Sequence, residues 1–145
     1  GSPGIGCPVI ASLTGTSLAL FVVEPTVSGL HDFRRVAELA MQLGVPGMLA
    51  VNKADVNEEA TRQLEDLARQ RGIAVVGRVP YDSAVTGAQV ARQTVVEASD
   101  GPAAQAIRAL WTEVHRRLQA STLAPVRVPV QLTLPVHAEN VSQVP

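Results

Sequence analysis

Short apolar runs alternate with helical patterns along the first 119 residues of the chain. Three runs are continuously apolar, as is typical of strands that are buried on both faces of a sheet, and they cover Leu18–Val23, Met48–Val51 and Ile73–Val76. The segments between them repeat their apolar residues at helical spacing and end at Gly44 and Gly72. Buried strands that are separated by helices predict parallel strands joined by right-handed crossovers. The pattern therefore predicts an α/β fold with a doubly wound, mainly parallel sheet.

Polar residues mark the expected starts of the two central helices. Ser28 and Asn57 stand just before the helical patterns, where a side-chain oxygen can accept a hydrogen bond from a free backbone N–H group. Three further helices are expected at Pro8–Thr14, Ser83–Ala91 and Asp100–Leu118. We expect Thr94–Ser99 to be irregular, and Trp111 fits the buried face of the last helix.

The end of the chain has a different pattern. Residues 120–145 are rich in proline and valine, and apolar residues alternate with polar ones between Val126 and Leu134. Pro129 and Pro135 would restrict a strand here to the edge of a sheet. We interpret residues 1–119 as part of a folded domain and residues 120–145 as a tail that is either an edge strand or disordered.

The composition fits one domain of moderate charge. The chain has 145 residues, of which 46% are hydrophobic and 17% charged, and its formal net charge is -1. These values suffice for a core and exclude a strongly basic nucleic-acid binder. The longest apolar run, Leu18–Val23, is far shorter than the roughly 20 residues of a membrane span. We expect a cytoplasmic protein with no nucleic-acid partner and no membrane span.

Two residue counts exclude classes of site. The chain has a single lysine, Lys53, and it lies in Val-Asn-Lys-Ala-Asp rather than in the Gly-Lys-Ser/Thr sequence of a phosphate-binding P-loop. Cys7 is the single cysteine, and with only His31, His115 and His137 beside it the chain offers no zinc or iron–sulfur ligand set. The chain also begins in a glycine-rich segment without an initiator methionine. We therefore interpret it as the later part of a longer polypeptide.

Polar residues follow each predicted strand, where ligands bind in parallel α/β sheets. Asn52–Asp55 has the pattern Asn-Lys-x-Asp, whose amide and carboxylate suit the polar edge of a purine. The alternative is an ordinary turn, since Asn and Asp favour turns. The glycine-rich residues 1–8 end at a helix start, where backbone N–H groups can bind phosphate, or they form a simple connector.

Four segments together resemble the MinD-like P-loop ATPases, and most of all the branch with an inserted ferredoxin-like iron–sulfur domain. The segments are residues 1–8, 24–32, 52–55 and 79–82. Ser2 stands where that family has a proline, and the Asp that precedes this segment in the family is absent. By resemblance, Asn52 hydrogen-bonds the adenine, the loop Pro80–Asp82 closes over the base, and Gly4 is the switch glycine near the terminal phosphate. The predicted nucleotide-binding residues are Gly4, Asn52, Lys53, Asp55, Pro80, Tyr81 and Asp82, with no catalytic or metal-binding residue in the chain.

The resemblance implies a Rossmann-like P-loop NTPase fold of which this chain is the C-terminal half. It would supply the adenine side of an ATP site in an ATP-dependent homodimer switch linked to iron–sulfur chemistry. ATP and Mg would be bound by the intact protein, an iron–sulfur cluster would lie in the missing N-terminal half, and this chain alone would hold none of them. Without a P-loop, the isolated chain is expected not to hydrolyse ATP.

The resemblance also places Leu18–Val23 inside the family's sheet, beside strands of the missing half. In this chain the run would then be an unpaired edge that attracts another strand. Two candidates could fill this edge: the alternating tail Val126–Leu134, folded back or exchanged between chains, or the same edge of a second copy. We therefore expect the chain to self-associate with its tail ordered as an extended segment, and we expect the missing half as its partner in the intact protein.

Two other functions remain open. Asn-Lys-x-Asp also reads guanine in GTPases, where the carboxylate accepts hydrogen bonds from the N1 and N2 hydrogens. The third strand, however, is followed by Val79–Asp82 and not by the Ser-Ala-Lys type of segment that such GTPases have. The second alternative is a non-enzymatic interaction domain that keeps the fold without nucleotide.

Overall fold

The computed structural model describes residues 6–122 as six helices and three strands. The elements are α1 (Cys7–Leu13), β1 (Ala19–Val23), α2 (Val27–Gln42), β2 (Gly47–Asn52), α3 (Glu58–Gln70), β3 (Ala74–Val79), α4 (Ser83–Val90), α5 (Val95–Ala98) and α6 (Pro102–Thr122). Gly4 and the tail from residue 123 onward lie outside the described residues. Among residues 6–122, no helix combines the length and the apolar character that a bilayer crossing requires.

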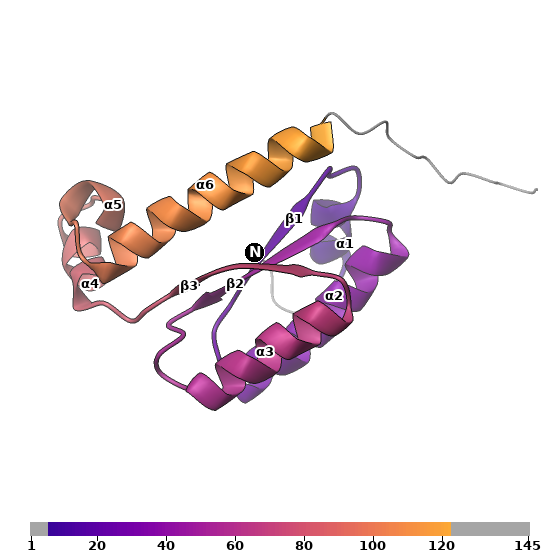
Figure 1. The fold of residues 1–145 in the computed structure, drawn as a ribbon, viewed down its shortest axis with the longest axis horizontal. Coiled ribbons are helices and arrows are strands. Elements are labelled where there is room, and N and C mark those ends of the chain that lie inside the picture. The colour runs from indigo at the N-terminus through magenta and orange to yellow at the C-terminus, as the bar shows by residue number, and fades with distance from the viewer. Residues whose placement is uncertain (1–5, 123–145) are drawn as a thin grey trace, which may run out of the picture.

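The three strands form one parallel sheet in the order β1-β2-β3. In Figure 1, α2 and α3 cover one face of this sheet and α6 crosses the other. Both crossovers between the strands carry a helix on the same face, as right-handed connections require. The doubly wound, parallel α/β fold expected from the sequence is thereby confirmed.

The main core lies between the sheet and the helices α2 and α3. Phe21 of β1 and Phe33 of α2 meet edge to face, with ring centroids 5.7 Å apart. Gly47 makes this packing possible, because a Cβ atom there would come within 2.7 Å of the Phe21 ring. The strand β2 is buried along its centre, and Leu49 and Val51 have no exposed surface. The continuous apolar run that predicted this strand reflects its central place in the sheet.

The opposite face of the sheet is covered by the single helix α6, whereas two helices cover the first face. Leu110 of α6 packs over Gly77 of β3, where a Cβ atom would lie 2.9 Å from the Leu110 side chain. Val114 is buried, but Trp111 is 63% exposed, so the expectation that Trp111 belongs to the core is wrong. A single helix that crosses the sheet buries only its innermost stripe, and Trp111 lies on the flank of that stripe.

Three local details also differ from the sequence-based expectations. Thr26, and not Ser28, caps α2, and its Oγ1 atom accepts a hydrogen bond from Gly29 N at 3.0 Å. Thr94–Ser99 contains the short helix α5 instead of irregular chain, because the Glu97 carboxylate accepts a hydrogen bond from Thr94 N. The strand β3 continues to Val79, three residues past the apolar run.

A partly buried ion pair joins β3 to α3. The Glu65 side chain is 7% exposed, and its carboxylate accepts hydrogen bonds from Arg78 Nε at 2.6 Å and Nη2 at 3.0 Å. Arg69 and Glu58 extend this network on the surface. The Arg78 guanidinium lowers the pKa of Glu65 and outweighs the opposing effect of burial. Glu65 is therefore a charged residue of α3 whose side chain is largely withdrawn from water.

We expect Arg78→Leu to destabilise the fold by about 1 to 2 kcal/mol, because the buried Glu65 carboxylate loses a bidentate charged partner. Because the pKa of Glu65 is lowered in the folded state, this contribution is complete above the ordinary pKa of 4.5 and is lost as the pH falls through the folded value. The wild type should therefore lose more stability on acidification than the variant. Urea unfolding at neutral and acid pH measures both effects.

The control for this prediction is Arg62→Leu, which removes an arginine from an exposed pair with Glu59 on the same helix. Exposed pairs contribute little, so the control should unfold like the wild type. Equal unfolding midpoints for Arg78→Leu and Arg62→Leu would contradict the importance of the pair between Arg78 and the buried Glu65 carboxylate.

Candidate functional site

The predicted site residues gather at the carboxyl edge of the sheet. Because the strands are parallel, the segments that follow β1, β2 and β3 emerge at the same edge. Glu24 directly follows β1, Asn52 ends β2, and Pro80 follows β3. Asn52 and Val79 are partners in the parallel register, so the Asn-Lys-x-Asp segment begins beside the loop Pro80–Asp82.

Asn52 has an uncommitted amide at this edge, that is, a side-chain amide without a hydrogen-bond partner within the described residues. The residue is partly buried at the end of β2. Within residues 6–122, its side chain makes no hydrogen bond to another part of the chain. An amide group carries both donors and an acceptor, so it can pair with a ligand that offers both.

Lys53 is held by an ion pair within the chain. Its Nζ atom lies 2.8 Å from Glu24 Oε1, which links the end of β2 to the end of β1. Both side chains are nearly half exposed, so the pair contributes little to stability. Lys53 also has a left-handed backbone, with φ of 52°, a conformation that is costly for a residue other than glycine and that clusters at functional sites.

Asp55 contacts the backbone of the neighbouring loop. Its Oδ1 atom accepts a hydrogen bond from Tyr81 N at 2.6 Å. Ala54 N donates to Val79 O at 3.0 Å, and the buried Thr61 hydroxyl donates to Ala54 O at 2.8 Å. The segment after β2 is therefore anchored both to the segment after β3 and to α3.

Asp82 organises the starts of two helices. Its Oδ1 atom accepts a hydrogen bond from Ala84 N at 2.9 Å and caps α4. Its Oδ2 atom accepts a longer hydrogen bond, of 3.3 Å, from Ala103 N in the first turn of α6. Tyr81, the residue before Asp82, is 58% exposed.

The charges at this edge suit an uncharged group better than a phosphate. Of the six predicted site residues that the structure describes, Lys53 is the single cation, and Glu24 already neutralises it. Asp55 and Asp82 are the acidic members of this set. Among the described residues, no group of three or more His, Cys, Asp and Glu side chains could hold a metal ion. The donor set of this chain therefore does not fit an iron–sulfur cluster, since Cys7 is its single cysteine.

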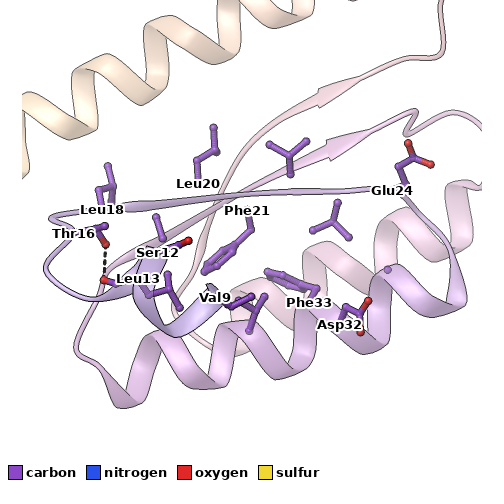
Figure 2. Close-up of a pocket in the computed structure, with 15 residues that line it drawn as sticks. Val9, Ser12, Leu13, Thr16, Leu18, Leu20, Phe21, Glu24, Asp32 and Phe33 are labelled. Carbon is purple, nitrogen blue, oxygen red and sulfur yellow. Dashed lines mark hydrogen bonds between the residues drawn. The ribbon is translucent and has the colours of Figure 1, made fainter. Parts of the chain in front are cut away.

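A second feature is a groove of about 600 Å³ along the outer edge of β1. Figure 2 shows Phe21 pointing into its floor, beside Val9 of α1 and Phe33 of α2, while Leu20 points the opposite way. Glu24 lines one end of the groove. Both faces of β1 are therefore apolar. Among the described residues, no strand pairs with the edge of β1 that faces away from β2.

Comparisons with known proteins give two partial relatives by sequence and several by structure. No protein family matches the chain. An uncharacterised protein and an uncharacterised ATP-binding protein of Methanocaldococcus jannaschii are each 39% identical to it, over 57 and 70 residues respectively. These matches cover 39% and 47% of this chain but only 21% and 26% of the two relatives.

Solved MinD structures share the fold of this chain over slightly less than half of their length. The septum site-determining protein MinD of Pyrococcus horikoshii, solved with Mg-ADP, matches 74% of this chain with a TM-score of 0.60 and 18% identity. The MinC:MinD complex of Aquifex aeolicus matches 77% with a TM-score of 0.54 and 25% identity. The chain thus has the Rossmann-like P-loop NTPase fold, and it spans 45% and 46% of the length of these two chains.

We expect Asp82→Ala to destabilise the fold by about 1 to 2 kcal/mol, because it removes the cap of α4 and leaves Ala103 N without this acceptor. Asp82→Asn keeps an acceptor oxygen and should cost less. Urea denaturation measures both changes. Asp66→Ala, at an exposed position of α3, should change stability by no more than about 0.5 kcal/mol. If Asp82→Ala is as stable as this control, the two contacts of Asp82 do not contribute to the free energy of unfolding.

Proposed function

We propose that this chain is the base-binding part of a MinD-like ATPase and that it supplies the adenine side of an ATP site. The observation that carries the proposal is the uncommitted Asn52 amide at the carboxyl edge of a parallel sheet, next to the loop Pro80–Asp82. The similarity to an ATP-binding protein and the MinD fold support it.

An adenine base fits the chemistry of this edge. Adenine offers an exocyclic amino group and ring nitrogens, which the carbonyl and NH₂ groups of one side-chain amide can match. The exposed Tyr81 and the backbone of Pro80–Asp82 lie on the β3 side of Asn52 and are proposed to close over the base. Lys53, Asp55 and Asp82 support these groups through their contacts within the chain.

The phosphates and Mg are proposed to be held by the remainder of the ATPase. Residues 1–145 contain no Gly-Lys-Ser/Thr sequence, and the single lysine is paired with Glu24. We propose that residues 1–119 form the C-terminal half of the ATPase domain, with Gly4 near the terminal phosphate, and that an N-terminal half brings a parallel strand into the groove beside β1. ATP hydrolysis would then require both halves.

The complete protein is proposed to work as an ATP-dependent dimer switch connected with iron–sulfur chemistry. Segment 24–28 would border the face where two subunits meet, and Val27 in it is 90% exposed. A MinD protein of this fold has been solved in complex with MinC, which supports the proposal that proteins of this fold assemble with partners. An iron–sulfur cluster would be carried by the N-terminal half, because the donors of this chain do not suit one.

In the complete protein we expect Asn52→Ala to weaken ATP binding by roughly ten to a hundredfold, since the loss of one partner of a polar contact at a partly buried site costs about 1 to 3 kcal/mol. Isothermal titration with ATP measures this change. Asn57→Ala is the matched control, because Asn57 caps α3 through Ala60 N and should affect stability but not affinity. Unchanged affinity in a folded Asn52→Ala protein would remove Asn52 from the site.

We expect the 145-residue chain to self-associate when it is studied by itself. The edge of β1 is apolar on both sides and carries backbone groups to which another strand can bond. Val22→Lys, at a 63% exposed position of β1, should reduce the association, because an edge lysine opposes strand pairing. Light scattering over a range of concentrations measures the effect.

The matched control for Val22→Lys is Val90→Lys, which places the same charge at an exposed valine of α4. It should leave the association unchanged. A wild-type chain that stays monomeric at all concentrations, or equal effects of the two lysines, would contradict the role of the β1 edge.

A further inference from the structure

We propose that Asp55 is a positioning residue that sets the shape of the base-binding loop and, through it, a preference for adenine over guanine. The inference rests on the proposed function, and it gives the carboxylate of the Asn-Lys-x-Asp segment a different task from direct reading of the base. The chemical class of ligand that follows is a 6-aminopurine nucleotide.

The contact between Asp55 and Tyr81 is short and of long range in the sequence. The acceptor Oδ1 and the donor Tyr81 N are 2.6 Å apart and belong to residues separated by 26 positions. A backbone N–H that donates to an ionised carboxylate forms one of the stronger hydrogen bonds in proteins. The adjacent bond from Ala54 N to Val79 O aligns the same two segments. Asp55 therefore determines where Tyr81 lies relative to β2.

The loop after β3 has two separate anchors. Asp55 holds the backbone of Tyr81, whereas Asp82 holds the starts of α4 and α6. Asn52 lies three residues before Asp55, at the end of the strand that pairs with β3. The first anchor thus fixes the loop relative to Asn52, and the second fixes it relative to the helices.

This arrangement disfavours guanine. Direct reading of guanine requires the carboxylate to accept hydrogen bonds from the N1 and N2 hydrogens, and here one of its two oxygens is engaged by Tyr81 N. Adenine has an acceptor at N1, which an acceptor-only carboxylate cannot bond. The adenine is therefore left to the Asn52 amide and to the loop backbone that Asp55 positions.

The test compares Asp55→Ala with Asp55→Asn, because an asparagine oxygen can still accept the hydrogen bond from Tyr81 N. In the 145-residue chain, hydrogen exchange of the Tyr81 amide reports the contact without any nucleotide. We expect Asp55→Ala to accelerate this exchange by about tenfold and Asp55→Asn to keep it near the wild-type rate. Asp66→Ala, an exposed aspartate of α3, should have no effect. Unchanged exchange in Asp55→Ala would overturn the inference.

In the complete protein, the affinities for ATP, GTP and xanthosine triphosphate report base selection. We expect Asp55→Ala to weaken ATP binding by about tenfold, and Asp55→Asn to restore it and to keep the preference for ATP. If Asp55 read guanine directly, the wild type would prefer GTP and the Asp55→Asn variant would prefer xanthosine triphosphate. That result would overturn the inference. If the wild type binds none of the three nucleotides, the proposed function and the base preference fail, whereas the Tyr81 exchange still decides whether Asp55 positions the loop.

Discussion

The parallel pairing of β1, β2 and β3 is the constraint on which the other features depend. Parallel strands need helical crossovers, and these crossovers place α2 and α3 over one face of the sheet and bury β2. The same direction brings the ends of all three strands to one edge. Glu24, Asn52 and Pro80 are neighbours for this reason alone, although they are far apart in the sequence.

The polar residues at this edge fall into two groups according to their partners. Lys53, Asp55 and Asp82 are engaged with Glu24, Tyr81 and helix starts inside the chain. The Asn52 side chain makes no such contact within the described residues. Turn formation and ligand binding use the same residue types, so the residue type alone does not separate a structural role from a binding one. The hydrogen-bond partners separate them here.

The sequence predicts the strands and most helices well because their signals are local. It misses the end of β3, since Gly77 and Arg78 interrupt the apolar run and owe their places to Leu110 and Glu65 on other elements. It also misplaces Trp111, because helical spacing identifies a face but not the width of the surface that covers it. At the site, the pattern predicts which segments meet but not the bond from Tyr81 to Asp55, which depends on the register of β2 and β3.

The groove beside β1 is physically connected to the carboxyl edge of the sheet, where a base is proposed to bind. Glu24 lines the end of the groove, and its carboxylate is paired with Lys53, the residue next to Asn52. A strand that fills the groove would therefore end beside this ion pair and reduce its exposure to water. The Coulomb attraction between the two charges grows as water is excluded, while the loss of their hydration costs free energy. A strand paired with the outer edge of β1 would in this way be linked, through Glu24, to the left-handed turn at Lys53 and to the amide proposed to bind the base.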